Sequence, residues 1–392
     1  MEGSVDILTK ELHPRAILPV TPGSSPVTRT SSEKKSRKRF FEHRHMIKNA
    51  GELLKQFELS EIQKPTCLID IKDFDFVASY NWSNSDVPRI FVPGCPAKWN
   101  PPSLPYQVRK DNGQVFIDQN SHRSPSASFD PFFKALLTMH PNFDMKPIGL
   151  ATDRNSLRKL LHFVSGKVPQ SWRIDVDIVE GTMFLTRWEK SQVQIITGAR
   201  DSGYGHDLGG IESLVRFEVD GYVDDGSGID DELSQALSGL HVKNSASIFA
   251  SSPASEVKVI QRGRLVDSKT ILELKSRSAN LKMQEIIPQL WIAQTHHLFV
   301  GRHKEGLVEV EPERLNMGEH FPTWESRNQE HLRTLVGLIT EIKAIATGVK
   351  GGKCMLVCKM EEKPRVLRMY KRNGKNFFLP VGAREKCWKN VN

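Results

Sequence analysis

Two acidic residues two positions apart, Glu218 and Asp220, form the first candidate site in the sequence. They belong to residues 215–220, VRFEVD, where apolar and charged side chains alternate as in a β-strand with one buried face. This alternation places both carboxylates on one face with Arg216, about 7 Å apart. Like charges so close raise each other's pKa, and a divalent cation with oxygen ligands relieves that repulsion. The pair therefore predicts a metal site.

The second candidate is the pair Glu273 and Lys275 in residues 271–275, ILELK. Alternation again puts the two charged side chains on one face, with leucines on the other. A carboxylate and an ammonium group beside a metal-bound water predict hydrolysis, because the metal activates the water while the lysine holds the nucleophile or the developing charge. Either pair alone also occurs by chance on the solvent side of a strand. Both pairs in this order favour a metal-dependent phosphodiesterase.

The composition is that of a globular protein of one large domain or two ordinary ones. The chain has 392 residues, of which 38% are hydrophobic and 26% charged. It has 55 Lys and Arg against 46 Asp and Glu, and the net charge of +9 suits a polyanionic partner, although it also suits solubility alone. The sequence contains no run of 18 apolar residues, the length that predicts a transmembrane helix. No membrane partner is therefore expected.

The first residues of the chain and its cysteines predict an intracellular protein. The first residues lack the apolar segment of a secretory signal. Five cysteines without a Cys-x-x-Cys pair argue against a disulfide framework and against a cysteine zinc site, and they fit a reducing compartment.

The pattern along the chain predicts one domain after a tail. Residues 1–48 are expected to be a disordered tail that ends in a basic run at 34–39, which suits a nuclear address, an RNA-contacting arm or a solvated charge run. Residues 49–392 are expected to be a single nuclease-like domain. Within it, the serine-rich residues 223–256 are expected to form a flexible insertion.

The elements that position the candidate residues are strands and helices in mixed order, which predicts an α/β (α+β) fold of mixed β-sheets flanked by helices. The expected helices are 130–140 with Asp130 as N-cap, 153–164, one that starts at Pro288, and 327–346. The expected strands are 74–82, 89–94, a hairpin over 171–189, 193–196, 214–223, 257–260, 270–275, a hairpin of 297–302 with 307–310, 353–359 and 364–371.

These motifs together resemble the decapping exoribonuclease (DXO) family, in particular its fungal branch, over about residues 50 to 350. The family has an arginine in a helix, and DRNSLRKLLHF matches it with Arg154. FEVD matches the family's acidic pair, and LELKSRS matches its glutamate–lysine pair. LWIAQT matches the family's helix glutamine with Gln294.

The resemblance implies a hydrolase of RNA 5′ ends in mRNA quality control. Expected substrates carry an incomplete or non-standard cap, a triphosphate or NAD at the 5′ end. The enzymes of the family often have 5′→3′ exonuclease activity as well, and the expected cofactor is Mg²⁺ or Mn²⁺. Expected partners are such RNA and a 5′→3′ exoribonuclease, and the expected location is the nucleus or the cytoplasm. By the same resemblance, the metal-binding positions are Glu218, Asp220, Glu273 and Leu274, and the substrate-binding positions are Arg154, Lys275 and Gln294.

One departure from the family points to an alternative function. Gly209 stands where the family has a further metal-binding glutamate, and Asp207, Glu212 and Glu189 are candidate substitutes. Loss of a metal ligand slows a metal-assisted reaction. The alternative is therefore a catalytically weakened relative that binds RNA or an exonuclease.

Other residues have two interpretations. Arg158 lies four residues after Arg154, so both occupy one helix face. Arg158 suits either a phosphate contact or a surface salt bridge. Tyr80, Trp82 and Trp99 suit either stacking on RNA bases or packing within the protein.

Overall fold

The structure, a computed structural model, describes residues 44–108, 117–125, 127–192, 201–208, 210–224, 257–278, 280–374, 379–380 and 382–388. Most of the predicted tail, the predicted strand 193–196, Gly209 and most of the predicted insertion at 223–256 lie outside the described residues. The unit described below is His45–Asn392.

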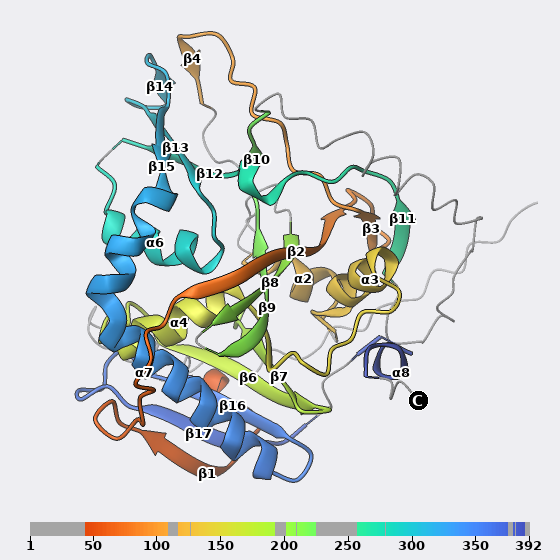
Figure 1. Cartoon of the computed structure of the whole chain (residues 1–392), viewed down its shortest axis with the longest axis vertical. Helices are drawn as coiled ribbons and strands as arrows, with labels where there is room; N and C mark the ends of the chain where they lie inside the picture. The colour runs from red at the N-terminus through yellow and green to blue at the C-terminus, as the bar shows by residue number, and fades with distance from the viewer. Residues whose placement is uncertain are drawn as a thin grey trace, which may run out of the picture. The chain divides into compact units, whose positions relative to one another are not determined.

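A large mixed sheet of 11 strands organises this unit (Figure 1). Strand β5 lies parallel to both β7 and β9 near its middle, and most other neighbours are antiparallel. In spatial order the strands are β1 (Ala50–Phe57), β17 (Leu367–Arg372), β16 (Lys353–Cys358), β6 (Trp172–Val179), β7 (Thr182–Trp188), β5 (Leu150–Asp153), β9 (Ile211–Glu218), β8 (Asp201–Leu208), β2 (Ile71–Trp82), β3 (Arg89–Val92) and β11 (Lys258–Gln261).

A second sheet has four strands, β10 (Gly221–Tyr222), β12 (Ile271–Arg277), β13 (His297–Arg302) and β15 (Glu313–Asn316). Strands β12 and β13 are parallel, and β10 and β15 pair antiparallel on either side. The two short strands β4 (Tyr106–Gln107) and β14 (Leu307–Val308) form a separate ribbon. The predicted fold class, mixed sheets flanked by helices, is therefore confirmed.

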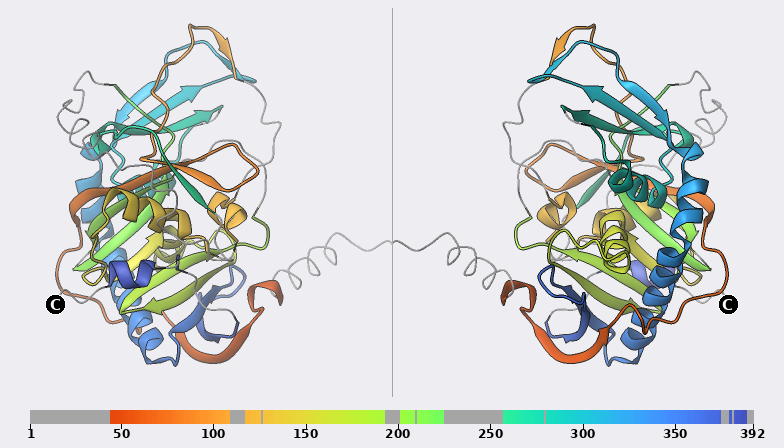
Figure 2. Two further views of the ribbon diagram at one scale, coloured as in Figure 1. Left: turned by 90° about the vertical axis from the view of Figure 1, so that its right-hand side faces the viewer. Right: turned by 90° about the vertical axis from the view of Figure 1, so that its left-hand side faces the viewer.

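Helices cover both faces of the large sheet. On one face lie α4 (Arg154–Val164), α6 (Met283–Ile292) and α7 (Phe321–Gly348), and on the other lies α3 (Asp130–Met139) (Figures 1 and 2). Short helices α2 (Gln119–Arg123) and α8 (Ala383–Cys387) and two 3-10 turns, Ser268–Thr270 and Met317–Glu319, complete the described elements.

Strand β9 shows how the sequence pattern produces this layering. Val215 and Phe217 pack in the apolar cluster under α4, α6 and α7, whereas Leu214 packs in the cluster under α3. Because side chains alternate along a strand, Arg216 lies on the α3 side. There its Nη1 donates to the main-chain oxygen of Ser128 at 2.6 Å, and its guanidinium lies 4.8 Å from the centre of the Phe129 ring.

Several predicted elements end or pair differently in the structure. The predicted strand 214–223 is two strands in two sheets, because the chain leaves the large sheet after Glu218 and enters the small one at Gly221. The predicted hairpin of 297–302 with 307–310 is wrong: β13 pairs with β12 and β15, and β14 pairs with β4.

Three helix starts also differ. Helix α7 begins at Phe321 rather than at residue 327. Helix α6 begins at Met283 and contains Pro288, since the buried Ile286 already belongs to its apolar face. In α3, Phe129 is the N-cap, and Asp130 is the first helical residue, 3.4 Å from the ammonium group of Lys134.

Helix α7 crosses the segment after β1 at Gly337, and this close approach requires a glycine. A Cβ added at Gly337 would overlap the main-chain oxygen of Gln63, whereas a Cβ added at Gly348, in the same helix, would meet no atom within 4 Å. Since alanine favours a helix over glycine by about 1 kcal/mol, helix propensity alone predicts that both substitutions stabilise the protein.

We predict opposite effects for these two substitutions. Gly337→Ala should lower the free energy of unfolding by about 1–3 kcal/mol through overpacking, and Gly348→Ala should leave it equal or higher. Urea denaturation of the two variants measures both values. Equal stability of the two variants would contradict the close approach of α7 to Gln63.

Candidate active site

The candidate site lies where β12 of the small sheet meets α4 and α6. Alternation along β12 places Leu272 in the buried interior, while Glu273 and Lys275 point to the side of α4. Glu273 is almost fully buried, with 5% of its surface exposed. A buried carboxylate needs charged or hydrogen-bonding partners, and the residues around Glu273 provide them.

Both carboxylate oxygens of Glu273 have partners. Oε2 lies 3.4 Å from Nη1 of Arg154, and Oε1 accepts from the ammonium group of Lys275. Oε1 also accepts from Nε2 of Gln289 at 3.1 Å. Burial opposes ionisation of Glu273, but the cations of Arg154 and Lys275 outweigh it and hold the pKa of Glu273 below its ordinary value. Glu273 is therefore an anion that ties α4, α6 and β12 together.

Asp220 lies beside this ion cluster in the connection between the two sheets. Its Oδ2 accepts from the main-chain N–H of Leu274 at 2.8 Å. The carboxylate stays accessible to solvent, but the surrounding protein partly desolvates it, and together with the negative charge of Glu273 this raises the pKa of Asp220. The Leu274 N–H, Lys275 and Arg154 oppose the rise without cancelling it. Asp220 therefore has less compensating positive charge than Glu273.

Arg154 is held in place by the start of α4. Asp153 caps the helix, since its Oδ1 accepts from the N–H of Ser156 at 2.7 Å. Arg154 is the first helical residue, and its guanidinium lies 5.6 Å from the centre of the Phe217 ring while it pairs with Glu273. Arg154 is thus in contact with Glu273, one of the predicted acidic residues.

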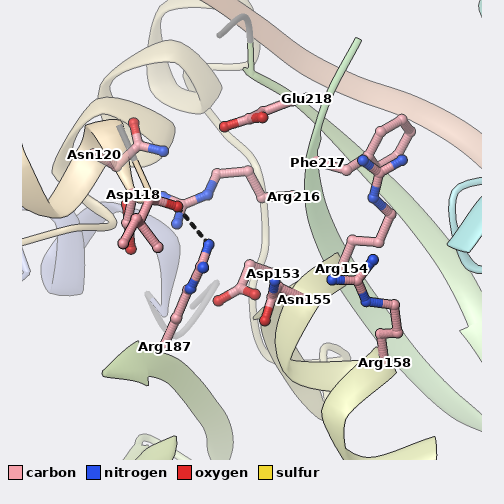
Figure 3. Close-up of a pocket in the computed structure, with 11 residues that line it drawn as sticks. Asp118, Asn120, Asp153, Arg154, Asn155, Arg158, Arg187, Arg216, Phe217 and Glu218 are labelled. Atoms are coloured by element: carbon pink, nitrogen blue, oxygen red, sulfur yellow. Dashed lines mark hydrogen bonds between the residues drawn. The ribbon is translucent and has the colours of Figure 1, made fainter. Parts of the chain in front are cut away.

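A polar recess of about 120 Å³ adjoins the ion cluster and shares Arg154 with it (Figure 3). We call it the arginine recess, because four arginines from α4, β7 and β9 line it. Its lining residues are Ile117, Asp118, Asn120, Asp153, Arg154, Asn155, Arg158, Arg187, Arg216, Phe217 and Glu218.

The two predicted metal-binding acids of β9 and its continuation have different surroundings. Glu218, the last residue of β9, lines the recess. The carboxylate of Asp220 instead accepts a hydrogen bond from the main chain of β12. The chain changes sheet between them, so strict strand alternation does not continue to Asp220. A cation shared by these two carboxylates remains a prediction.

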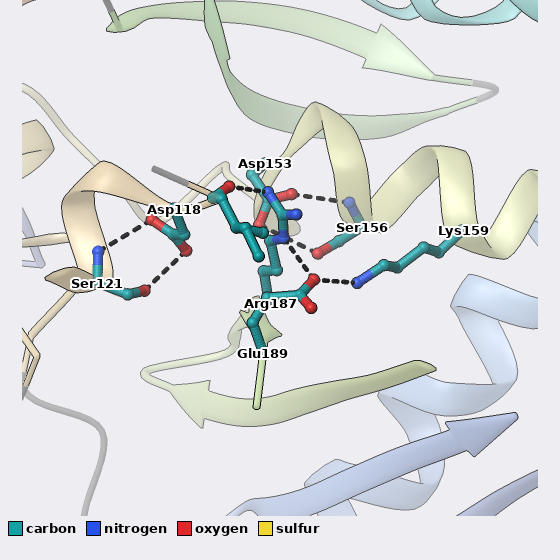
Figure 4. A network of polar contacts seen from close by, with 8 residues as sticks. Asp118, Ser121, Asp153, Ser156, Lys159, Arg187 and Glu189 are labelled. Atoms are coloured by element: carbon teal, nitrogen blue, oxygen red, sulfur yellow. Dashed lines mark hydrogen bonds and ion pairs between the residues drawn. The ribbon is translucent and has the colours of Figure 1, made fainter. Parts of the chain in front are cut away.

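Under the recess, an ion network fixes Arg187 (Figure 4). Glu189 Oε1 accepts from Nε of Arg187 at 2.7 Å and from the ammonium group of Lys159 at 2.9 Å. Burial would raise the pKa of Glu189, but Lys159 and Arg187 lower it overall. Two cations already neutralise Glu189, so it is a poor substitute for the metal-binding glutamate that the family resemblance predicts at position 209.

The pairing of β8 with β9 places the other two candidate substitutes, Asp207 and Glu212, opposite each other. This hairpin pairs Asp207 with Glu212 and Asp201 with Glu218. Glu212 is six residues from Glu218 on β9, about 20 Å along an extended strand, which is too far to share a metal with it. The consequence of Gly209 itself for activity stays a prediction, because Gly209 lies outside the described residues.

The glutamine at the ion cluster is Gln289 rather than Gln294. Helix α6 ends at Ile292, so Gln294 lies beyond it, where its Nε2 donates to the main-chain oxygen of Trp291 at 2.7 Å. Gln289 is buried inside α6 between Glu273 and Arg158, and its Oε1 accepts from Nη1 of Arg158 at 3.0 Å. In the sequence, Gln289 follows Pro288 in an apolar run and carries no signal that separates it from an ordinary helix residue.

The three aromatic residues that the sequence offers for base stacking, Tyr80, Trp82 and Trp99, pack within the protein. The hydroxyl of the fully buried Tyr80 and the indole N–H of Trp82 both donate to Oδ1 of Asn120, at 2.9 and 2.8 Å. Trp99 lies edge-on to Phe299, with ring centres 5.2 Å apart. These contacts favour packing over stacking on RNA bases.

The donor set suits a cation that arrives with a phosphate ligand. Within the described ranges, no group of three or more His, Cys, Asp or Glu side chains is arranged to hold a metal ion. Asp220 and Glu273 do lie together, and partial desolvation, followed by the negative charge of Glu273, raises the pKa of Asp220. Mg²⁺ and Mn²⁺ prefer such oxygen ligands, and Mg²⁺ is commonly held by one or two carboxylates together with substrate phosphates.

Comparison with solved structures identifies the fold. S. pombe Rai1 shares 11% sequence identity, with 81% of this chain and 99% of that chain covered and a TM-score of 0.51. A mutant S. pombe Rai1 in complex with 3′-FADP gives the same values. K. lactis Dxo1 in complex with manganese shares 10% identity, with 83% and 97% covered and a TM-score of 0.45.

The chain therefore has the fold of Rai1, and the resemblance to the fungal decapping exoribonucleases is confirmed for the fold. By sequence, it belongs to the family described as a domain of unknown function (DUF8563), whose model matches residues 58–208 and 206–388. Among curated protein sequences, no match to this chain is found. In the part of the chain that the structure describes, no helix is both long enough and apolar enough to span a membrane.

We predict that Gln289 stabilises the ion cluster. Gln289→Leu should lower the free energy of unfolding by about 1–3 kcal/mol, because Glu273 and Arg158 each lose a buried hydrogen-bond partner. Gln284→Leu, at an exposed position of the same helix, is the matched control and should change stability by no more than about 0.5 kcal/mol. Chemical denaturation measures both, and equal values would show that the Gln289 contacts are energetically unimportant.

Proposed function

We propose that this protein is a metal-dependent hydrolase of RNA 5′ ends that removes incomplete caps, triphosphates or NAD, with 5′→3′ exonuclease activity as a further reaction. The observation that carries the proposal is the cluster of Asp220, Glu273, Lys275 and Arg154 in a chain with the Rai1 fold. Two acids and two cations in one cluster are what hydrolysis of a phosphoanhydride or phosphodiester needs.

In this proposal each side chain has a distinct task. Arg154 and Lys275 bind the oxygens of the scissile phosphate and neutralise the charge that develops as water attacks phosphorus and the bond to the leaving oxygen breaks. Glu273 fixes both cations in place. Asp220, with Glu273 and the main chain of Leu274 beside it, would hold Mg²⁺ or Mn²⁺, which would supply a more acidic water and charge neutralisation. Glu218 would face the substrate from the recess.

The remaining expectations from the resemblance are part of this proposal. The substrate class is RNA with a cap, triphosphate or NAD at its 5′ end, and the process is mRNA quality control. A 5′→3′ exoribonuclease as a protein partner and a location in the nucleus rest on the family resemblance and on the basic run at 34–39.

A second candidate is a catalytically weakened protein that binds RNA 5′ ends or an exonuclease. It is favoured by one observation: both oxygens of Glu273 are already paired with Arg154, Lys275 and Gln289. A carboxylate with those partners binds a metal less readily, because the cations compete for its charge. This candidate predicts RNA binding without metal-dependent turnover.

An assay on RNAs that carry different 5′ ends, with Mn²⁺ or with EDTA, tests the proposal. We predict metal-dependent release of 5′-monophosphate RNA by the full chain. Asp220→Asn and Lys275→Met should each lower kcat by about 10²–10³-fold, since each removes one charge that acts on the reacting phosphate. Lys350→Met, at an exposed position in the turn after α7, is the control and should retain full activity.

Two outcomes would reject the hydrolase. One is turnover that survives both site substitutions or EDTA. The other is the absence of turnover in a protein that binds 5′-triphosphate RNA, and this result would establish the second candidate instead.

A further inference from the structure

Arg158 is a residue of the arginine recess that has no task in the proposed reaction. It lies one turn of α4, about 5.4 Å, beyond Arg154, and it lines the same recess (Figure 3). Arg154 is paired with Glu273, and Arg187 is paired with Glu189. The question is therefore which anion Arg158 meets.

Arg158 has a neutral partner in place of an ionic one. Its Nη1 donates to the amide oxygen of Gln289 at 3.0 Å. Among the described residues, no carboxylate lies within ion-pair distance of its guanidinium. The alternative interpretation from the sequence, a surface salt bridge, is therefore not what these residues form.

The surroundings of Arg158 make its charge costly. Burial, and then the positive charges of Arg154 and Arg187, lower the pKa of Arg158, and the carboxylates of Glu273 and Asp153 oppose this without cancelling it. An arginine stays protonated in a protein, so this shift represents an energetic penalty rather than a loss of charge. An anion that enters the recess would relieve it, because it would pair with guanidinium groups that now repel one another.

Another group in the recess lacks a hydrogen-bond partner among the described residues. Oδ1 of Asn155, the residue after Arg154 in α4, is buried without a hydrogen bond within the described part of the chain. A buried acceptor without a donor costs free energy. A ligand that carries a hydroxyl or N–H group next to its anionic group would satisfy both Asn155 and Arg158.

We propose that Arg158 is a specificity-determining residue that pairs with a phosphate beyond the scissile one, so that the site favours 5′ ends with a phosphoanhydride over 5′-monophosphate ends. This inference rests on the proposed function, since Arg154 and Lys275 are taken to hold the scissile phosphate. The hydroxyl donor to Asn155 comes from the group that follows those phosphates.

Gln289 connects the two phosphate positions. Its amide accepts from Arg158 through Oε1 and donates to Glu273 through Nε2. A phosphate that pulls the Arg158 guanidinium into the recess would loosen one of these bonds. Binding of the distal phosphate is thus linked to the residue that fixes Arg154 and Lys275.

Calorimetric titration of the full chain with inorganic pyrophosphate and with inorganic phosphate, in EDTA, tests the inference. We expect pyrophosphate to bind at least about tenfold more tightly than phosphate, because it reaches both arginines. Arg158→Gln should remove this preference and change phosphate binding by less than about threefold. Arg327→Gln, at an exposed position of α7, is the matched control and should change neither.

The inference is overturned if wild-type protein binds the two anions equally, or if Arg158→Gln keeps the preference for pyrophosphate. Unfolding curves of Arg158→Gln show that the variant is folded, and Arg158→Lys serves as a second variant that keeps the charge but loses the paired N–H donors. It should recover only part of the preference.

A kinetic experiment separates this inference from the proposed function. In Mn²⁺, Arg158→Gln should lower kcat/KM for 5′-triphosphate RNA by about tenfold or more relative to 5′-monophosphate RNA. If ATP shows the same dependence on Arg158 as the triphosphate RNA, the phosphoanhydride of a free nucleotide is also a ligand. If Arg158→Gln turns over RNA with the wild-type ratio of triphosphate to monophosphate kcat/KM, the inference is rejected and the hydrolase proposal stands. If the protein prefers pyrophosphate in an Arg158-dependent way but shows no turnover, the inference stands and the hydrolase proposal is rejected.

Discussion

The candidate site depends on one physical constraint: the carboxylate of Glu273 is buried and must still carry its charge. An ionised group in that position is stable only with charged or hydrogen-bonding partners on each oxygen. Arg154 from α4, Lys275 from β12 itself and Gln289 from α6 supply them. One anion therefore fixes the relative positions of three elements, of which α4 is far from β12 and α6 in the sequence, and with them the two cations that face the proposed substrate.

The change of sheet after β9 completes this arrangement. Strand β9 carries Glu218 to the edge of the recess, and the chain then enters the small sheet as β10, which pairs with β12. Asp220 lies in the two residues between them and is anchored by the N–H of Leu274. The connection thus brings an acid from one sheet to an acid of the other. In this connection the carboxylate of Asp220 has too little positive charge around it to balance its own. A cation, free or bound to a phosphate, would supply the balancing charge.

Much of the fold could be predicted from the sequence, because period-2 and period-3.6 patterns record which faces are buried. Helices α4 and α7 and the hairpin of β6 and β7 follow this rule. The break between β9 and β10 could not be predicted, since alternation continues through Val219 while the pairing partner changes. The partners of β13 and β14 depend on long-range pairing, which local patterns do not encode. Strand alternation pointed to Glu273 and Lys275, and the family resemblance added Arg154. The role of Gln289 becomes notable only through its contacts across α4 and α6, and the same contacts distinguish the two interpretations of Arg158.

A crystal structure of the full chain with Mn²⁺ and a non-hydrolysable 5′-triphosphate oligonucleotide, with the metal located by its anomalous scattering, tests the central claim most directly. The account predicts manganese bound to Asp220 and to a phosphate oxygen, with Arg154 and Lys275 on the scissile phosphate and both still positioned by Glu273. Manganese or the triphosphate bound away from Asp220 and Lys275 would contradict it.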